Sequence, residues 1–180
     1  MDNEDKVSGN KEIFKAVQDG NLSLFKLHFQ KSDLINLSID VDVLLSPQEK
    51  QESFHSLVTM KFNIIHFIIV SREEEILNFL LNKSSKEDLE VVLKGTVDIK
   101  DEPFKDYFGN EEKYAEEDAW INGATCLHLA ARLTSKALHI LLTSNSSKET
   151  CKELVNNRTK LWNMTPLHVC ANSTTSISTR

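Results

Sequence analysis

The most constraining feature of this sequence is an internal repeat. When the chain is shifted by 62 residues, residues 65–67 align with residues 127–129, and the Ser-Ser-Lys-Glu segment at 84–87 recurs unchanged at 146–149. Each copy reads as a short apolar helix, a polar break and a second helix with apolar residues at helical spacing. Serine followed by glutamate three residues later marks a third helix, predicted to begin near Ser84 and Ser146 and to end near Leu93 and Val155. Such copies bury their apolar faces by stacking.

Two segments carry a more specific motif. Residues 123–131 read Gly-Ala-Thr-Cys-Leu-His-Leu-Ala-Ala, and residues 165–171 read Thr-Pro-Leu-His-Val-Cys-Ala. Both resemble the signature of the ankyrin-repeat family, a glycine turn followed by Thr-Pro-Leu-His-x-Ala-Ala at the start of a helix. Weaker copies lie at residues 13–29 and 63–69. The resemblance implies an all-α fold, an ankyrin-repeat solenoid of helix-turn-helix units with a long acidic insertion between repeats.

The spacing of the repeated histidines locates the unit boundaries. His66 and His128 are 62 residues apart and His128 and His168 are 40 apart, against a family period of about 33 residues. Residues 1–10 are predicted to be a disordered N-terminus and residues 95–119 an acidic insertion loop. Within an array spanning 11–171, we predict repeats near residues 11–38, 60–94, 122–157 and 162–180, the last of them incomplete.

The signature residues have local physical roles. Thr125 and Thr165 can cap the first helical turn, and Pro166 suits the first helical position because it has no amide hydrogen to leave unpaired. Asn163 stands where the family has its turn glycine, and asparagine tolerates positive φ better than most residues. Small side chains in the same helices let neighbouring helices approach closely, namely Ala130, Ala131 and Ala171.

The chemically active side chains form no catalytic or metal-binding pattern. His66, His128 and His168 recur once per unit, which predicts a packing role. The rings of His128 and His168 are expected to form hydrogen bonds between adjacent turns and repeats. Cys126 and His128 are two positions apart, so their side chains point away from each other on a helix. The sequence has no Cys-x-x-Cys or His-Glu-x-x-His spacing and no glycine-rich phosphate loop. We therefore expect no metal, no cofactor and no enzymatic activity.

Charge is distributed unevenly along the chain. The formal net charge is -6, and nine acidic residues against three lysines lie between Asp98 and Asp118. No basic stripe is present to neutralise a phosphate backbone, so nucleic acid is not an expected partner. The acidic first residues do not resemble a secretion signal, and the longest apolar stretch, residues 62–70, is too short to span a bilayer. We expect a protein of the cytoplasm or nucleus without direct membrane insertion.

The expected partner is another protein. The acidic insertion is either a solvated loop or, because aromatic residues alternate with its acids, a segment that docks on a basic, apolar partner. Trp120 and Trp162 precede predicted repeats, where ankyrin proteins project finger tips, so each is either a binding anchor or packs on the adjacent repeat. The predicted protein-binding residues are Asp101, Glu102, Asp106, Tyr107, Phe108, Trp120, Arg132 and Trp162.

The resemblance implies a protein–protein interaction scaffold or adaptor, such as a regulator or inhibitor of a signalling partner. The alternative is an N-terminal ankyrin module of a larger protein, such as a cation channel, a multidomain enzyme or a ubiquitin-ligase adaptor. The polar residues after Ala171 do not encode a second helix for the last repeat, which favours the alternative.

Overall fold

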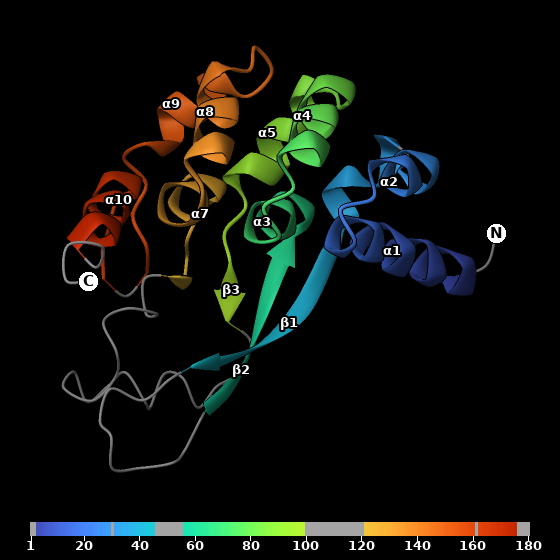
Figure 1. The fold of residues 1–180 in the computed structure, drawn as a ribbon, viewed down its shortest axis with the longest axis horizontal. Helices are drawn as coiled ribbons and strands as arrows, with labels where there is room; N and C mark the ends of the chain where they lie inside the picture. Colours follow the sequence, from blue (N-terminus) through green and yellow to red (C-terminus); the bar gives the residue numbers. More distant parts are fainter. Residues whose placement is uncertain (1–2, 30, 46–55, 100–120, 161, 176–180) are drawn as a thin grey trace.

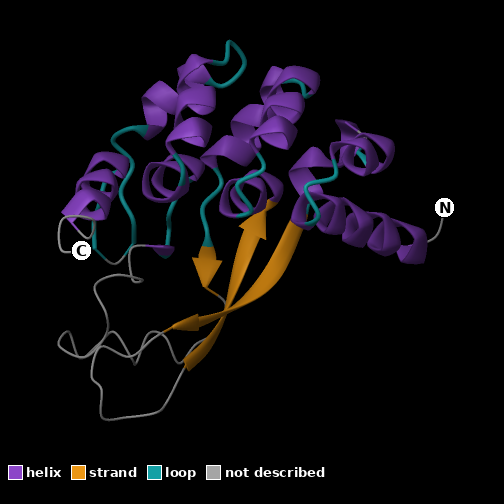
Figure 2. Ribbon diagram, in the orientation of Figure 1, coloured by secondary structure: helices purple, strands orange, loops and turns teal. Residues whose placement is uncertain are grey.

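The computed structural model describes residues 3–29, 31–45, 56–99, 121–160 and 162–175. Helices stack side by side, and a three-stranded antiparallel sheet projects from one edge of the stack (Figure 1, Figure 2). The prediction of an all-α ankyrin-repeat solenoid is therefore wrong, because residues 38–63 contain two paired strands and the fold is mixed α/β. In chain order the elements are α1 (Asn3–Gln18), α2 (Leu22–His28), η1 (Lys31–Asn36), β1 (Ser38–Leu45), β2 (Ser56–Asn63), α3 (Ile64–Val70), α4 (Glu74–Lys83), α5 (Lys86–Lys94), β3 (Asp98–Ile99), α7 (Cys126–Leu133), α8 (Ser135–Thr143), α9 (Lys148–Leu154) and α10 (Pro166–Thr175).

The sheet forms where polar and apolar side chains alternate. Ile39 of β1 lies opposite Phe62 of β2, and Ile99 of β3 lies opposite Met60, so these apolar side chains share the face that packs on the core. Because β3 begins at Asp98, the first part of the predicted acidic insertion loop belongs to the sheet. The pairing of β1 with β2 runs from Ser38 opposite Asn63 to Leu45 opposite Ser56.

The helices are arranged as stacked pairs. We call α1, α3, α7 and α10 the inner helices and α2, α4 and α8 the outer helices. Inner helix α3 packs against α7 and α7 against α10, while outer helix α4 packs against α8 (Figure 1). Helix α1 begins at Asn3, inside the segment predicted to be disordered. Each unit therefore covers apolar surface on its neighbour, as the repeat requires.

The predicted third helices are confirmed as α5 and α9, which pack against each other. Ser85 caps α5 by accepting a hydrogen bond from the Asp88 amide at 3.1 Å. Ser147 precedes α9 but donates its hydroxyl to the Leu141 carbonyl at 2.7 Å. The same Ser-Ser-Lys-Glu segment thus starts a helix in both units, although its serine makes different bonds.

The turns before α7 and α10 have the backbone conformation that the motif predicts. Gly123 has φ of 78° and Asn163 has φ of 53°, so asparagine does replace glycine in a left-handed turn. Thr125 is the N-cap residue of α7, and Pro166 is the first residue of α10. These local predictions are confirmed.

Enlarging Ala130 should destabilise the stack. This side chain is fully buried on α7, which packs against both α3 and α10. We expect Ala130→Leu to lower the free energy of unfolding by about 1–3 kcal/mol, because extra methylene groups force the helices apart. Ala171→Leu places the same group on an exposed position of α10 and should change stability by about 0.5 kcal/mol or less. Urea denaturation of both variants measures the difference, and equal midpoints would contradict close packing at Ala130.

Candidate functional site

Histidines at the starts of the inner helices complete the helix caps. The amide and hydroxyl of Thr125 lie 3.1 and 2.9 Å from His128 Nδ1, and Thr165 makes the same contacts with His168 at 3.3 and 2.7 Å. Since Nδ1 accepts, the proton of a neutral His128 ring is on Nε2, which donates to the Met164 carbonyl at 2.9 Å. This bond joins α7 to the turn before α10, so the predicted hydrogen bond between units is confirmed for His128.

His66 occupies the same position at the start of α3 but lacks the second bond. The Asn63 amide donates to Nδ1 at 3.4 Å, while Nε2 has no hydrogen-bond partner among the described residues. Burial lowers the pKa of His66 to about 3, and the backbone of Gly95 offsets the shift only in part. A ring that stays neutral and buried near pH 7 belongs to the core and is unsuited to proton transfer.

The buried cysteines are also unsuited to chemistry. Burial raises the pKa of the Cys151 thiol to about 12, and it raises the pKa of Cys126 as well. Cys126 Sγ lies 3.6 Å from the Leu93 carbonyl. In the part of the chain that the structure describes, no three His, Cys, Asp or Glu side chains are placed to hold a metal ion. The buried histidines and cysteines therefore form no candidate site.

The sheet continues into the turns between units. The Gly123 amide donates to the Val97 carbonyl at 3.0 Å, and the Lys160 amide donates to the Asn122 carbonyl at 2.9 Å. Backbone bonds thus connect the strands to the turns that precede α7 and α10, along the side of the stack from which the strands project (Figure 2). We call this surface the strand edge; it consists of β1–β3 and residues 121–125, 159–160 and 162–164.

A groove of about 630 Å³ lies between α1 and β1 at one end of the strand edge. Phe14 and Phe67 meet edge to face in it, with ring centroids 5.3 Å apart, and Ile39 of β1 adds an aliphatic side chain. This combination of an apolar floor with a charged rim suits an apolar side chain presented by a polar surface. The rim consists of the exposed side chains of Lys11, Lys15, Asp19 and Asp40.

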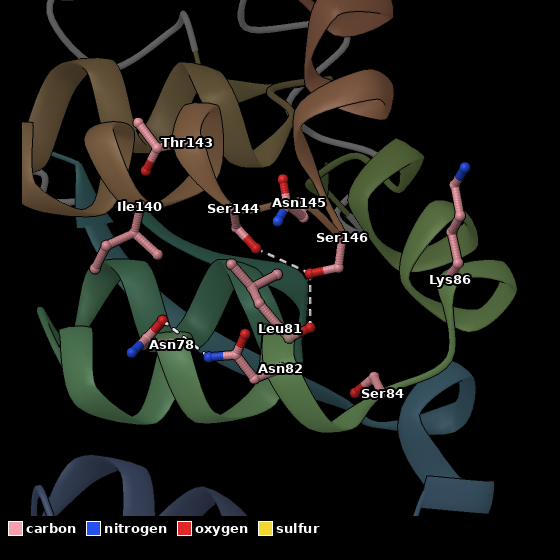
Figure 3. Close-up of a pocket in the computed structure, with 10 residues that line it drawn as sticks. All are labelled: Asn78, Leu81, Asn82, Ser84, Lys86, Ile140, Thr143, Ser144, Asn145 and Ser146. Atoms are coloured by element: carbon pink, nitrogen blue, oxygen red, sulfur yellow. Dashed lines mark hydrogen bonds between the residues drawn. The ribbon is translucent and has the colours of Figure 1, made fainter.

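A second groove, of about 500 Å³, lies between α4 and the turn that joins α8 to α9 (Figure 3). Ser146 Oγ donates to the Leu81 carbonyl at 2.7 Å and lies 2.9 Å from Ser144 Oγ. Because these groups bond to one another across the boundary between two units, they stabilise the stack. The polar side chains that line this groove are those of Asn78, Asn82, Ser84, Lys86, Thr143, Ser144, Asn145 and Ser146. The α1–β1 groove, with its aromatic floor, is the stronger candidate site.

The structure separates the predicted binding residues that it describes. Trp162 lies in the turn before α10, with 37% of its surface exposed. Arg132 is half-buried in the last turn of α7. The His128–Met164 bond holds the Trp162 turn beside the first turn of α7, so the two residues lie toward opposite ends of that helix. The other predicted residues lie outside the described residues, namely Asp101, Glu102, Asp106, Tyr107, Phe108 and Trp120.

Reasoning from the repeat missed the residues of the α1–β1 groove. Ile39 belongs to a run that alternates polar and apolar residues from Ser38 to Val43, the period expected of a half-buried strand. That signal was available in the sequence. No comparable signal pairs Phe14 with Phe67, because these residues are 53 positions apart and meet only when α1 and α3 pack.

Searches for related proteins identify no family for this chain. None of the helices in the described residues is both long enough and apolar enough to cross a membrane. No family model, no curated protein and no solved structure matches the sequence.

Proposed function

We propose that this chain is a protein-binding scaffold that engages its partner along the strand edge. The observation that carries the proposal is the α1–β1 groove, where Phe14 and Phe67 are framed by exposed charged side chains. An apolar centre with a polar rim is the usual composition of a protein interface. Trp162 is exposed at the other end of the strand edge and supplies a second anchor of the type that dominates binding energies.

A protein fits this surface better than a small ligand. The groove runs between α1 and β1, and its rim carries two lysines and two aspartates, so a partner gains by matching charges of both signs over an extended area. The ankyrin-like segments at residues 123–131 and 165–171 support the same proposal, because ankyrin-repeat proteins bind other proteins. An adaptor or regulator of a signalling partner is the function we propose.

Reversing charges on the rim should weaken partner binding. We expect Lys11→Glu/Lys15→Glu to reduce the capture of a specific partner from cell extract and to raise its Kd at least tenfold (about 1.4 kcal/mol), because like charges then surround the groove. Lys83→Glu/Lys136→Glu is the matched control with the same change of net charge, since these lysines are exposed on α4 and α8, away from the strand edge. Quantitative mass spectrometry of captured proteins, followed by surface plasmon resonance, measures both effects. Equal losses in the two variants would show that only net charge matters.

Trp162→Ala in the same binding assay tests the other end of the strand edge. A contact residue should accelerate dissociation and cost on the order of 2 kcal/mol of binding free energy. The melting temperature of the variant distinguishes a contact from a packing role. A lower melting temperature with unchanged Kd would assign Trp162 to packing on the adjacent helix pair.

A further inference from the structure

The outer helices share a six-residue pattern that shows how each packs on its neighbour. Counted from the N-cap residues of α2, α4 and α8, the pattern occupies residues 24–29, 76–81 and 137–142. Phe79, at the fourth position in α4, has its ring 6.1 Å from Phe25 and 6.3 Å from Phe29 of α2. Phe29 is the sixth position of the preceding pattern. The fourth position of one outer helix therefore meets the sixth position of the helix before it.

In the next pair of outer helices the residues at these two positions line one groove, whereas the sixth position of the last outer helix is exposed. Leu81, at the sixth position in α4, is 1% exposed, and it borders the same groove as Ile140, the fourth position of α8 (Figure 3). Leu142 is the sixth position in α8, and 43% of its surface is exposed. The side of α8 that corresponds to the covered side of α4 thus has no described helix against it.

The last inner helix, α10, also has an exposed apolar side chain, at a position where the other inner helices bury theirs. Counted from their N-cap residues, Ile65 in α3, Leu127 in α7 and Leu167 in α10 are equivalent. Ile65 is fully buried and Leu127 is 1% exposed, whereas Leu167 is 76% exposed. Helices α3 and α7 each pack against an outer helix, α4 and α8 respectively. The described part of the chain ends at residue 175 and includes no outer helix for α10.

We propose that Leu142 and Leu167 border a docking site for one amphipathic helix of another polypeptide, which lies where a fourth outer helix would lie. Continuity with the interfaces inside the stack defines the occupant: it covers α10 as α8 covers α7, and it meets α8 as α8 meets α4. Its apolar residues must follow the spacing of residues 76–81, with one large side chain against Leu142 and others against Leu167. This is recognition of a helix by its apolar stripe. This docking site lies at the opposite end of the stack from the α1–β1 groove.

A peptide copy of an outer helix tests the site directly. The probe is a fluorescein-labelled, N-acetylated peptide with the sequence of residues 72–83, which contains the whole of α4. We expect saturable binding in fluorescence anisotropy, weakened at least tenfold by Leu142→Glu and by Leu167→Glu. Val91→Glu is the control, because Val91 is 53% exposed on α5 and lies outside the pattern of the outer helices. That variant should bind like the unmodified chain, and a peptide with Phe79→Glu should not bind.

Several outcomes would overturn the proposal. The first is the absence of saturable binding. The second is an equal loss in Val91→Glu, which would indicate non-specific apolar contact. Sedimentation of the chain alone covers a third outcome: self-association that Leu167→Glu abolishes would assign the face to a second copy. Circular dichroism checks that each variant folds, and Leu167→Gln repeats the test without a charge. The Lys11→Glu/Lys15→Glu variant should still bind the peptide, so this result is independent of the α1–β1 groove.

Discussion

Lowering the pH from 7 to about 4 should destabilise this protein by roughly 3 kcal/mol through His66 alone. Burial lowers the pKa of His66 in the folded protein to about 3, from an ordinary value of 6.5. Between these two values the unfolded chain binds a proton that the folded chain does not. The stability that depends on an uncharged His66 is therefore fully present above about pH 6.5, and it is lost progressively as the pH falls toward 3. Burial also lowers the pKa of His128, which adds to the effect in the same direction.

His66→Gln isolates this contribution from that of the carboxylates. His66 is the third residue of α3 and accepts from the Asn63 amide, a position in which glutamine completes a capping box without titrating. Urea denaturation from pH 7 to pH 4 should show a shallower loss of stability in the variant than in the unmodified chain. Parallel curves for His66→Gln and the unmodified chain would show that His66 becomes protonated in the folded state without penalty.

Gly123→Ala should cost roughly 2–4 kcal/mol of stability, combining a left-handed backbone penalty of about 1–2 kcal/mol with local overpacking. Gly123 has φ of 78°, and a Cβ atom there would lie 2.6 Å from Lys160 Cγ and 2.9 Å from the Lys160 backbone nitrogen. The Lys160 amide is held by the Asn122 carbonyl at 2.9 Å, so it moves only by breaking a backbone bond of the strand edge. An ion pair at 3.1 Å between Lys160 Nζ and Asp98 Oδ1 is disturbed as well.

Gly20→Ala is the matched comparison for the Gly123 variant. Gly20 has φ of 62°, but a Cβ atom there would meet only the Glu73 carboxyl group, at 3.1 Å or more. That side chain can move, so the variant should show the left-handed penalty alone, about 1–2 kcal/mol. The difference between the two unfolding free energies measures the crowding at Lys160. Equal values would mean that the turn before α7 relaxes at no cost.

Local features of the fold were predictable from short segments. The N-cap position of Thr125, the bond from the His168 amide to the Thr165 hydroxyl, the helix start at Pro166 and the left-handed turn at Asn163 were predicted and confirmed. Each depends on residues within one or two turns of backbone. The helices after Ser84 and Ser146 have the same local origin. The all-α prediction was wrong, because the repeat and its family resemblance were given more weight than the alternation from Ser38 to Val43.

The exposed residues and the groove could not be predicted from short segments of sequence. Leu127 and Leu167 stand in equivalent sequence motifs, yet one is 1% and the other 76% exposed. This difference in exposure depends on which helices pack beside α7 and α10. The α1–β1 groove likewise needs Phe14 and Phe67, which come from separate units, and neither segment contains a sign of the other.

By itself the sequence determined where α5, α7, α9 and α10 begin, since a helix start depends on hydrogen bonds between residues three or four positions apart. Only the tertiary structure decided how β1, β2 and β3 pair, which leucines stay exposed and how far the pKa of His66 falls. Strand pairing, burial and desolvation depend on contacts between distant segments. Residues with the same local sequence therefore acquire different environments from their positions in the stack.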